Sequence, residues 1–277
     1  MKKLRDKLKT AAAIALCAVL CAGLAGCAGS FGSSVIVTGS TSVQPLTKEL
    51  AKGFMESERG IDVIVNSTDS SKAVDAISDS SADIGALSRE PVDGEMQSVK
   101  KKYTIAIDGV AVIVNKDVEV SDLSLSQLKK IFTGEIKNWS EVGGQDKKIT
   151  VVSREAGSGT REVFTEKTKV YDGKTDRTTK SAAVRISAYK VVKTVASKQG
   201  SIGYISLAQA GRSVRTLSVN GVMPSVKTVR NGDYPIQRPF IYIVGYNASA
   251  ATGKFIKYVM SDDAQARLQE RGYVTVK

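Results

Sequence analysis

The chain has 277 residues, of which 42% are hydrophobic and 25% are charged. These proportions are typical of a globular protein and argue against global disorder and a collagen-like structure. The sequence contains no histidine, which excludes serine-histidine and cysteine-histidine nucleophile systems and every histidine-ligated metal site. Lysine and arginine number 40 against 28 aspartate and glutamate residues, so the formal net charge is +12.

The first 26 residues have the pattern of a leader for export. Residues 1–9 carry five basic residues and one acidic residue, and an alanine-rich apolar run follows over residues 11–25. A charged start followed by an apolar run of this length is typical of a signal peptide. The run is shorter than the roughly 20 residues that a membrane-spanning helix needs. The alternative, a buried N-terminal helix, is disfavoured because the run has no capping residues.

The three cysteines, Cys17, Cys21 and Cys27, all lie in this leader or directly after it. The remaining chain therefore has no disulfide, no thiolate nucleophile and no cysteine metal ligand. The segment Leu24-Ala25-Gly26-Cys27 resembles the bacterial lipobox, in which the cysteine sulfur receives diacylglycerol. We predict a lipoprotein signal peptide over residues 1–26, lipid attachment at Cys27, and a lipid-anchored tether over residues 27–34. This predicts an exported protein held at the outer face of the cell membrane by its acyl chains.

The chain remains basic after removal of the leader. Loss of residues 1–26 lowers the formal net charge from +12 to +8. The basic residues are scattered over amphipathic segments, without a long basic run or an aromatic RNA-binding motif, so we expect no nucleic-acid partner. Solvated surface charge is the simplest explanation, and anionic lipid, cell-wall polymer or a small anion are the alternatives.

Apolar segments with strand character alternate with amphipathic segments of helical period after the tether. In chain order we predict a strand over 35–37, a helix over 43–55, a strand over 62–65, a helix over 72–78, strands over 83–86 and 106–115, a helix over 126–132, a strand over 149–152, helices over 161–168 and 187–196, strands over 201–205 and 236–246, and helices over 253–260 and 263–269. Pro239 is expected to break the last strand. This alternation predicts an α/β fold with largely parallel sheets.

Three of the predicted strands end in a Ser/Thr-rich turn that opens a helix. The turns are residues 38–42 (TGSTS), 67–71 (STDSS) and 154–160 (REAGSGT). A helix N-terminus presents unpaired N–H groups with a partial positive charge, hydroxyls add donors, and glycine lets a ligand approach the backbone. One such turn is ordinary capping. Because turns at the carboxyl ends of strands gather at one edge of an α/β sheet, three of them can converge on one small oxyanion.

Arg154 would add a fixed positive charge and a two-pronged donor to the third turn. The alternative is a surface arginine that pairs with Glu155 or Glu162. The GSG run of this turn does not match the Walker A pattern, because no Gly-Lys-Ser/Thr follows it.

The sequence resembles the phosphate-binding lipoproteins that serve as substrate-binding components of bacterial high-affinity phosphate ABC transporters. The segments that carry the resemblance span essentially the whole chain after the leader: residues 39–45, 67–77, 82–90, 108–117, 131–144, 153–164, 200–208 and 234–240. The resemblance implies a two-lobed periplasmic-binding-protein fold of type II, in which each lobe is a mixed sheet flanked by helices. Lobe one would contain residues 35–115 and 233–277, lobe two would contain residues 116–232, and the ligand would lie in the cleft between them.

The resemblance also implies which residues contact the anion. Carried over by position, the phosphate-binding residues are Thr41, Ser42, Ser70, Ser88, Arg154, Ser158, Gly159 and Thr160. Some members of the family have an aspartate at the position of Ser88, where the carboxylate accepts the proton of phosphate. Asp69 is a possible substitute acceptor in this chain, and helix N-capping is the alternative role for it.

The expected function is capture of inorganic phosphate and its delivery to the transmembrane subunits of an ABC permease. We expect a monomer without catalytic residues, cofactor or metal. Three alternatives stay open at this stage. One keeps the fold and changes the ligand to sulfate, molybdate or tungstate, the second is a hydrolase that uses Ser158, and the third is a surface adhesin or sensor.

Overall fold

The computed structural model describes residues 33–276, so the predicted signal peptide, Cys27 and nearly all of the tether lie outside the described residues. Residues from Ser34 onward form one unit. Its strands are β1 (Ser33–Ser40), β2 (Ile61–Thr68), β3 (Ile84–Leu87), β4 (Val99–Val114), β5 (Asp122–Leu123), β6 (Thr150–Arg154), β7 (Ala183–Arg185), β8 (Ser201–Ser206), β9 (Arg215–Thr216), β10 (Ser218–Val219) and β11 (Gln237–Gly245).

Helices connect most of these strands. They are α2 (Gln44–Ser57), α3 (Ser70–Ser78), α4 (Leu125–Thr133), α5 (Gly159–Lys167), α6 (Ala188–Ser197), α7 (Val226–Arg230), α8 (Ala250–Val259) and α9 (Asp262–Glu270), with short 3-10 helices at Asp93–Met96, Trp139–Val142 and Leu207–Gln209. None of the helices within residues 33–276 is both long enough and apolar enough to cross a bilayer.

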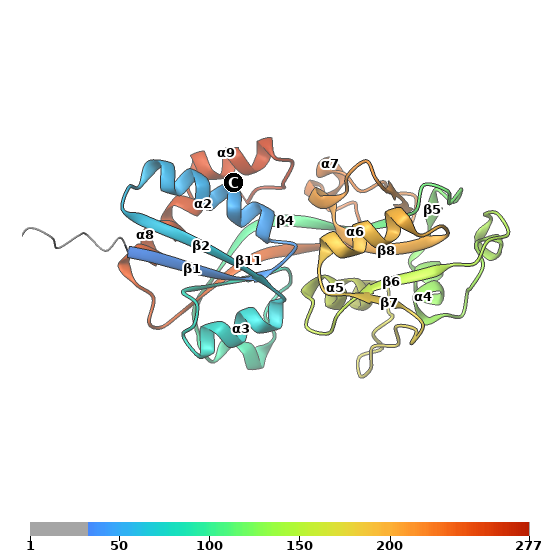
Figure 1. Ribbon diagram of the computed structural model, residues 1–277, viewed down its shortest axis with the longest axis horizontal. Helices are drawn as coiled ribbons and strands as arrows, with labels where there is room; N and C mark the ends of the chain where they lie inside the picture. Colours follow the sequence, from blue (N-terminus) through green and yellow to red (C-terminus); the bar gives the residue numbers. More distant parts are fainter. Residues whose placement is uncertain (1–32, 277) are drawn as a thin grey trace, which may run out of the picture. The chain divides into compact units, whose positions relative to one another are not determined.

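The main sheet has mixed strand directions and runs in the order β2-β1-β3-β11-β4-β8-β6-β7 (Figure 1). The outer pairs β1–β3, β6–β8 and β6–β7 are parallel. The central pairs β3–β11, β11–β4 and β4–β8 are antiparallel. The prediction of an α/β fold is therefore confirmed, whereas the expectation of largely parallel sheets holds only for the outer strands. Turns after the carboxyl ends of β1 and β6 lead into α2 and α5. Both turns lie at the site described below.

The two long strands β4 and β11 contribute to both hydrophobic cores (Figure 1). One core packs β1, α2 and the C-terminal helices around Ala106, Phe240 and Tyr242. The other packs Trp139, Phe164 and Tyr204 around Val110, Val112 and Ile236. The change from one core to the other falls near Asp108 on β4 and near Arg238 on β11, which are paired directly across the ladder.

All the predicted helices and strands form, and the differences lie at their ends and in short elements. β4 begins at Val99, several residues before the predicted start, because Val99, Lys101 and Lys102 pair with β11 while the side chains of residues 100–102 stay exposed. Pro239 does not end β11. It lies opposite Ile107, whose N–H donates to Val274 O (2.8 Å) instead. The short elements β5, β7, β9, β10 and α7 carry too few residues for a periodic signal.

Candidate functional site

The first Ser/Thr-rich turn lies between β1 and α2. Thr41 and Ser42 follow the last residue of the strand and precede the first turn of the helix. Ser42 is fully buried, and its N–H donates to Ser40 Oγ (3.3 Å). The Thr41 hydroxyl accepts the N–H of Ala188 (3.4 Å) at the start of α6. This contact connects the first turn to a fourth helix N-terminus, which the sequence analysis had not included.

The second turn lies between β2 and α3. Asp69 caps α3, since its Oδ1 accepts the N–H of Lys72 (2.8 Å). Ser70, the first residue of α3, is fully buried. Its Oγ accepts the N–H of Ser88 (3.2 Å), which follows β3 directly. The second turn is thereby joined to the end of a neighbouring strand of the same sheet.

The third turn lies between β6 and α5. Arg154 is the last residue of β6 and Ser158 is the N-cap of α5, where its Oγ accepts the N–H of Arg161 (3.4 Å). Gly159 and Thr160 form the first turn of α5 and are buried. Gly157 has a φ of 81°, a left-handed conformation that glycine adopts without steric cost. The chain can therefore turn sharply between Arg154 and the helix.

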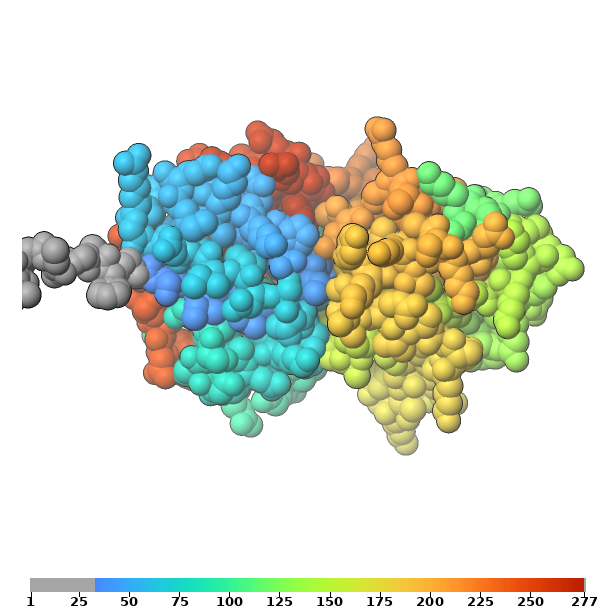
Figure 2. Space-filling model, viewed as in Figure 1, coloured from blue at the N-terminus to red at the C-terminus, as the bar shows by residue number. Residues whose placement is uncertain are grey.

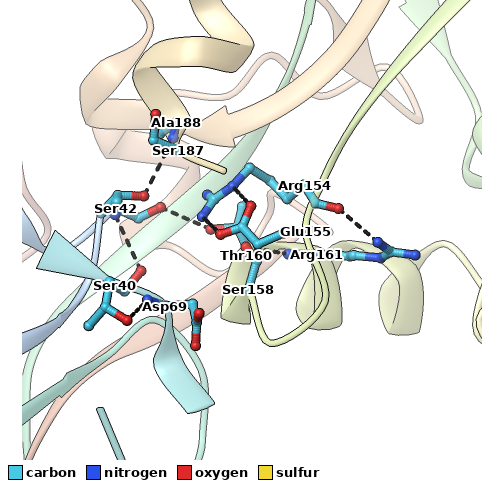
Figure 3. Close-up of polar contacts among 12 residues, drawn as sticks. Ser40, Ser42, Asp69, Arg154, Glu155, Ser158, Thr160, Arg161, Ser187 and Ala188 are labelled. Carbon is cyan, nitrogen blue, oxygen red and sulfur yellow. Dashed lines mark hydrogen bonds and ion pairs between the residues drawn. The ribbon is translucent and has the colours of Figure 1, made fainter. Parts of the chain in front are cut away.

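The three turns meet at a buried cluster of hydroxyl groups, of which Figure 3 shows Ser40, Ser42 and Thr160. Ser42 Oγ lies 2.9 Å from Thr160 Oγ1. Ser88 Oγ accepts from Ser40 Oγ (2.9 Å) and lies 3.3 Å from Ser70 Oγ. A Cβ atom at Gly159 would lie 2.5 Å from Ser70 Oγ and 2.8 Å from Ser88 Oγ. The hydroxyls of the first two turns thus lie directly against the start of α5.

Arg154 places a buried positive charge beside this cluster. Only 1% of its surface is exposed, and in Figure 3 its guanidinium extends from β6 toward Ser42 and Thr160. Its Nε and Nη2 donate to the two carboxylate oxygens of Glu155 at 2.8 and 2.7 Å. Its buried Nη1 has no hydrogen-bond partner among the described residues. The ion pair with Glu155 is the alternative that we had considered, but the arginine is not on the surface and keeps a free donor for an acceptor.

A second ion-pair group connects the segment after β3 to α5. Arg89 is buried and binds Glu95 through two contacts of 2.6 Å, and its Nε pairs with Glu162 of α5. Burial alone would lower the pKa of Arg89, but the carboxylates of Glu95, Glu162 and Asp69 raise it above its ordinary value. Burial raises the pKa of Glu162, and the charge of Arg89 opposes this shift. The Arg89–Glu162 pair therefore connects the segment after β3, which carries Ser88, to α5, which follows the third turn.

Arg238 and Asp108 form an ion pair that the sequence analysis did not select. Both are almost fully buried, and Nη2 of Arg238 lies 2.9 Å from Asp108 Oδ2. Burial raises the pKa of Asp108 and lowers that of Arg238, and each partner's charge opposes the other's shift. The charge of Arg154 lowers the pKa of Arg238 further. A signal was present in the sequence, because each residue is a lone charge in a long apolar strand segment.

The structure gives several predicted site residues different roles. Ser42, Ser70, Ser88, Gly159 and Thr160 lie together in or against the hydroxyl cluster. The hydroxyls of Thr41 and Ser158 contact helix N-termini, and Asp69 caps α3 and pairs with Lys72 (3.6 Å). The capping role that we had considered for Asp69 is therefore present.

The chemistry of the site is that of anion binding. Its groups are hydroxyls, helix N-terminal N–H groups and a buried guanidinium, all of which donate hydrogen bonds to oxyanions. Within residues 33–276, no group of three or more cysteine, aspartate or glutamate side chains is arranged to hold a metal ion. The cluster is closed to solvent, since Ser42, Ser70, Ser88 and Thr160 have no exposed surface.

Known proteins share this architecture. Residues 28–263 match the family model described as a PBP superfamily domain. The chain is 35% identical to the phosphate-binding protein PstS of Bacillus subtilis over 88% of its own length and 81% of the relative. It is 25% identical to PstS of Borreliella burgdorferi over 88% of its own length and 90% of the relative.

Comparison with solved structures also points to phosphate-binding proteins of transporters. A crystal structure from Clostridium perfringens, described as a phosphate ABC transporter substrate-binding protein with bound phosphate, has a TM-score of 0.85 and 33% identity, and covers 88% of this chain and 100% of that one. An ABC-type phosphate transport receptor from Vibrio cholerae has a TM-score of 0.74 and 29% identity, over 87% and 99% of the two chains. These matches confirm the two-lobed fold and the resemblance drawn from the sequence. The chain belongs to the PBP superfamily and, within it, to the family of the phosphate-binding protein PstS.

Proposed function

We propose that this protein binds inorganic phosphate between its two lobes and delivers it to the permease of an ABC transporter. The observation that carries the proposal is the meeting of three helix-opening turns beside the buried Arg154. A tetrahedral oxyanion needs donors from several directions, and these turns come from well-separated parts of the chain. Relatives named as phosphate-binding proteins and a solved relative with bound phosphate support phosphate over sulfate, molybdate and tungstate.

We assign the phosphate contacts to the residues taken from the resemblance, namely Thr41, Ser42, Ser70, Ser88, Arg154, Ser158, Gly159 and Thr160. Asp69 is left out, because its carboxylate caps α3 through the N–H of Lys72 and pairs with the Lys72 ammonium. The oxygens of Ser70 and Ser88 can accept a hydrogen bond as well as donate one. They can therefore accept a hydrogen bond from the P–OH group of hydrogen phosphate without a carboxylate.

We place the division between the lobes at Asp108 on β4 and at Arg238 on β11. The family resemblance implies crossings after residue 115 and before residue 233. Val110, Val112 and Ile236 pack in the core that contains Trp139, which supports crossings nearer to the Asp108–Arg238 pair. Phosphate would reach the buried cluster when the lobes separate, and the cross-lobe contacts would re-form around it.

The cellular setting follows the family and the leader. The protein is exported and bound to the outer face of the membrane through acyl chains on Cys27, and it acts as a monomer. We propose no catalytic role, because the relatives are named as phosphate-binding proteins of transporters. An adhesin or sensor role has no specific observation in its favour.

Titration calorimetry on protein freed of phosphate tests the function. We expect one phosphate to bind per chain, with binding little affected by an excess of sulfate. Binding of sulfate or molybdate in place of phosphate would contradict the ligand assignment, and absence of binding by any tetrahedral oxyanion would contradict the proposed function.

A Glu162→Gln variant is expected to bind phosphate about three- to tenfold more weakly. The substitution removes the charge that pairs with the buried Arg89 across the lobes, and a partly exposed ion pair contributes on the order of 1 kcal/mol. The matched control is Glu90→Gln, which removes an exposed ion pair with Lys102 and should leave the affinity unchanged. Calorimetry on both variants checks this, and equal affinities would show that the Arg89–Glu162 pair does not favour closure.

A further inference from the structure

The Arg238–Asp108 pair reaches the anion site through one hydrogen bond. Arg238 Nη1 donates to Thr160 Oγ1 at 2.6 Å. Thr160 is also 2.9 Å from Ser42 Oγ, so a single hydroxyl joins the buried pair to the first turn. The Thr160 side chain has no exposed surface, and this contact is therefore shielded from water.

The remaining contacts of the guanidinium fix its orientation. Nε and Nη2 both donate to Asp108 Oδ2, at 3.1 and 2.9 Å, and the ring of Phe240 lies 5.2 Å from the guanidinium carbon. Asp108 is itself held, since its Oδ1 accepts from Ser206 Oγ (2.8 Å). Two of the three nitrogens are thus engaged by the carboxylate, and the third is aimed at Thr160.

A hydroxyl that accepts from a charged donor becomes a better donor itself. Thr160 Oγ1 has one hydrogen and two lone pairs, and Arg238 occupies one lone pair with a charge-assisted bond. Hydrogen bonds in a chain polarise one another, and the effect is largest where water is excluded. Because Arg238 occupies a lone pair, the Thr160 hydrogen can point to an acceptor on the side where Ser42 and Arg154 lie, either Ser42 Oγ (2.9 Å) or an oxygen of a bound anion.

We propose that Arg238 is a positioning residue of the anion site, which orients and polarises the Thr160 hydroxyl so that it donates to a bound oxyanion. Asp108 holds the guanidinium in place for this task. The inference rests on the proposed function, with phosphate as the oxyanion. It adds a residue from β11 that does not touch the ligand itself, and it gives the crossing strands a direct influence on affinity.

A double-mutant cycle on the full-length chain tests the proposal, with phosphate affinity measured by calorimetry. The first substitution is Thr160→Val, which removes the hydroxyl. The second is Arg238→Lys, which keeps the positive charge and loses the forked geometry. We expect Arg238→Lys to weaken binding about tenfold in the otherwise unchanged chain, and by less than twofold when Thr160→Val is already present, because the two residues act through one bond.

The matched control is Thr168→Val. Thr168 lies at the end of the same helix and is buried, but its hydroxyl donates to Phe164 O (2.7 Å) within α5. Arg238→Lys should have its full effect in that background. A second pair variant, Arg238→Gln with Asp108→Asn, removes both charges together and leaves no unpaired buried ion. We expect this paired substitution to weaken phosphate binding in the otherwise unchanged chain. It should have little further effect on phosphate affinity when Thr160→Val is already present.

Additive effects of Arg238→Lys and Thr160→Val would overturn the inference, because they would show that Arg238 acts on folding or on the general field of the site. Unchanged affinity in Arg238→Lys would overturn it as well. These outcomes differ from failure of the proposed function, which would appear as absence of phosphate binding by the unsubstituted chain.

Discussion

An Arg154→Gln variant is expected to bind phosphate at least about 100-fold more weakly than the unsubstituted protein. Hydrogen bonds to a charged group each contribute roughly 1.5–3 kcal/mol, and the guanidinium supplies both such bonds and the buried positive charge of the site. Its Nη1 has no partner among the described residues, so this donor is the group most directly available to the anion. Titration calorimetry measures the loss.

Stability must be separated from binding in this experiment. Arg154→Gln leaves the carboxylate of Glu155, whose side chain is only 18% exposed, without its partner. The double variant Arg154→Gln with Glu155→Gln removes both charges, and we expect its thermal unfolding without phosphate to be close to that of the parent. Arg177→Gln is the control, because that arginine is mostly exposed and pairs with Asp172. A folded double variant with parental affinity would show that Arg154 belongs only to the scaffold.

A Gly159→Ala variant is expected to lose affinity for phosphate by about 10- to 100-fold. The added Cβ would lie 2.5 Å from Ser70 Oγ, 2.8 Å from Ser88 Oγ and 3.0 Å from Arg89 Cγ. Contacts this short force the surrounding atoms apart, and an additional methyl group in a packed site typically costs about 1–3 kcal/mol. The start of α5 could then not approach the hydroxyls of the first two turns, so the closed arrangement would be disfavoured.

The backbone of α5 itself tolerates the substitution, because Gly159 is helical and alanine favours helices. Gly253→Ala is the matched control. Gly253 lies inside α8 and a Cβ there meets nothing within 4 Å, so we expect unchanged binding and slightly higher stability. Calorimetry on both variants, with circular dichroism to verify folding, makes the comparison. Equal affinity in Gly159→Ala would mean that the turns do not have to come this close for binding.

Local patterns were sufficient to predict most of the elements and the type of site. The strands and helices follow from apolar periodicity, and the Ser/Thr-rich turns follow from capping chemistry, in which Ser158 and Asp69 accept N–H groups of their own helices. The family resemblance then pointed to the phosphate-binding proteins, and the comparisons confirmed it. Predictions failed where segments far apart in the chain decide the local structure. At the start of β4, basic residues form a strand because β11 lies beside them.

The sequence by itself therefore determined the α/β class, the absence of histidine chemistry and three donor-rich turns, because each depends only on residues close together in the chain. The tertiary structure decided which hydroxyls meet, that Arg154 is buried against Glu155, and that Arg238 of β11 reaches Thr160 of α5. Those contacts join residues that are many positions apart, such as Ser42 and Thr160, or Asp108 and Arg238. Figure 2 shows such a long-range contact at the surface, where the blue segment of β1 and α2 meets the gold region, and Thr41 between β1 and α2 accepts hydrogen bonds from Ala188 and Gln209. Burial and long-range pairing arise only when strands far apart in sequence become neighbours in one sheet, and no local pattern encodes that adjacency.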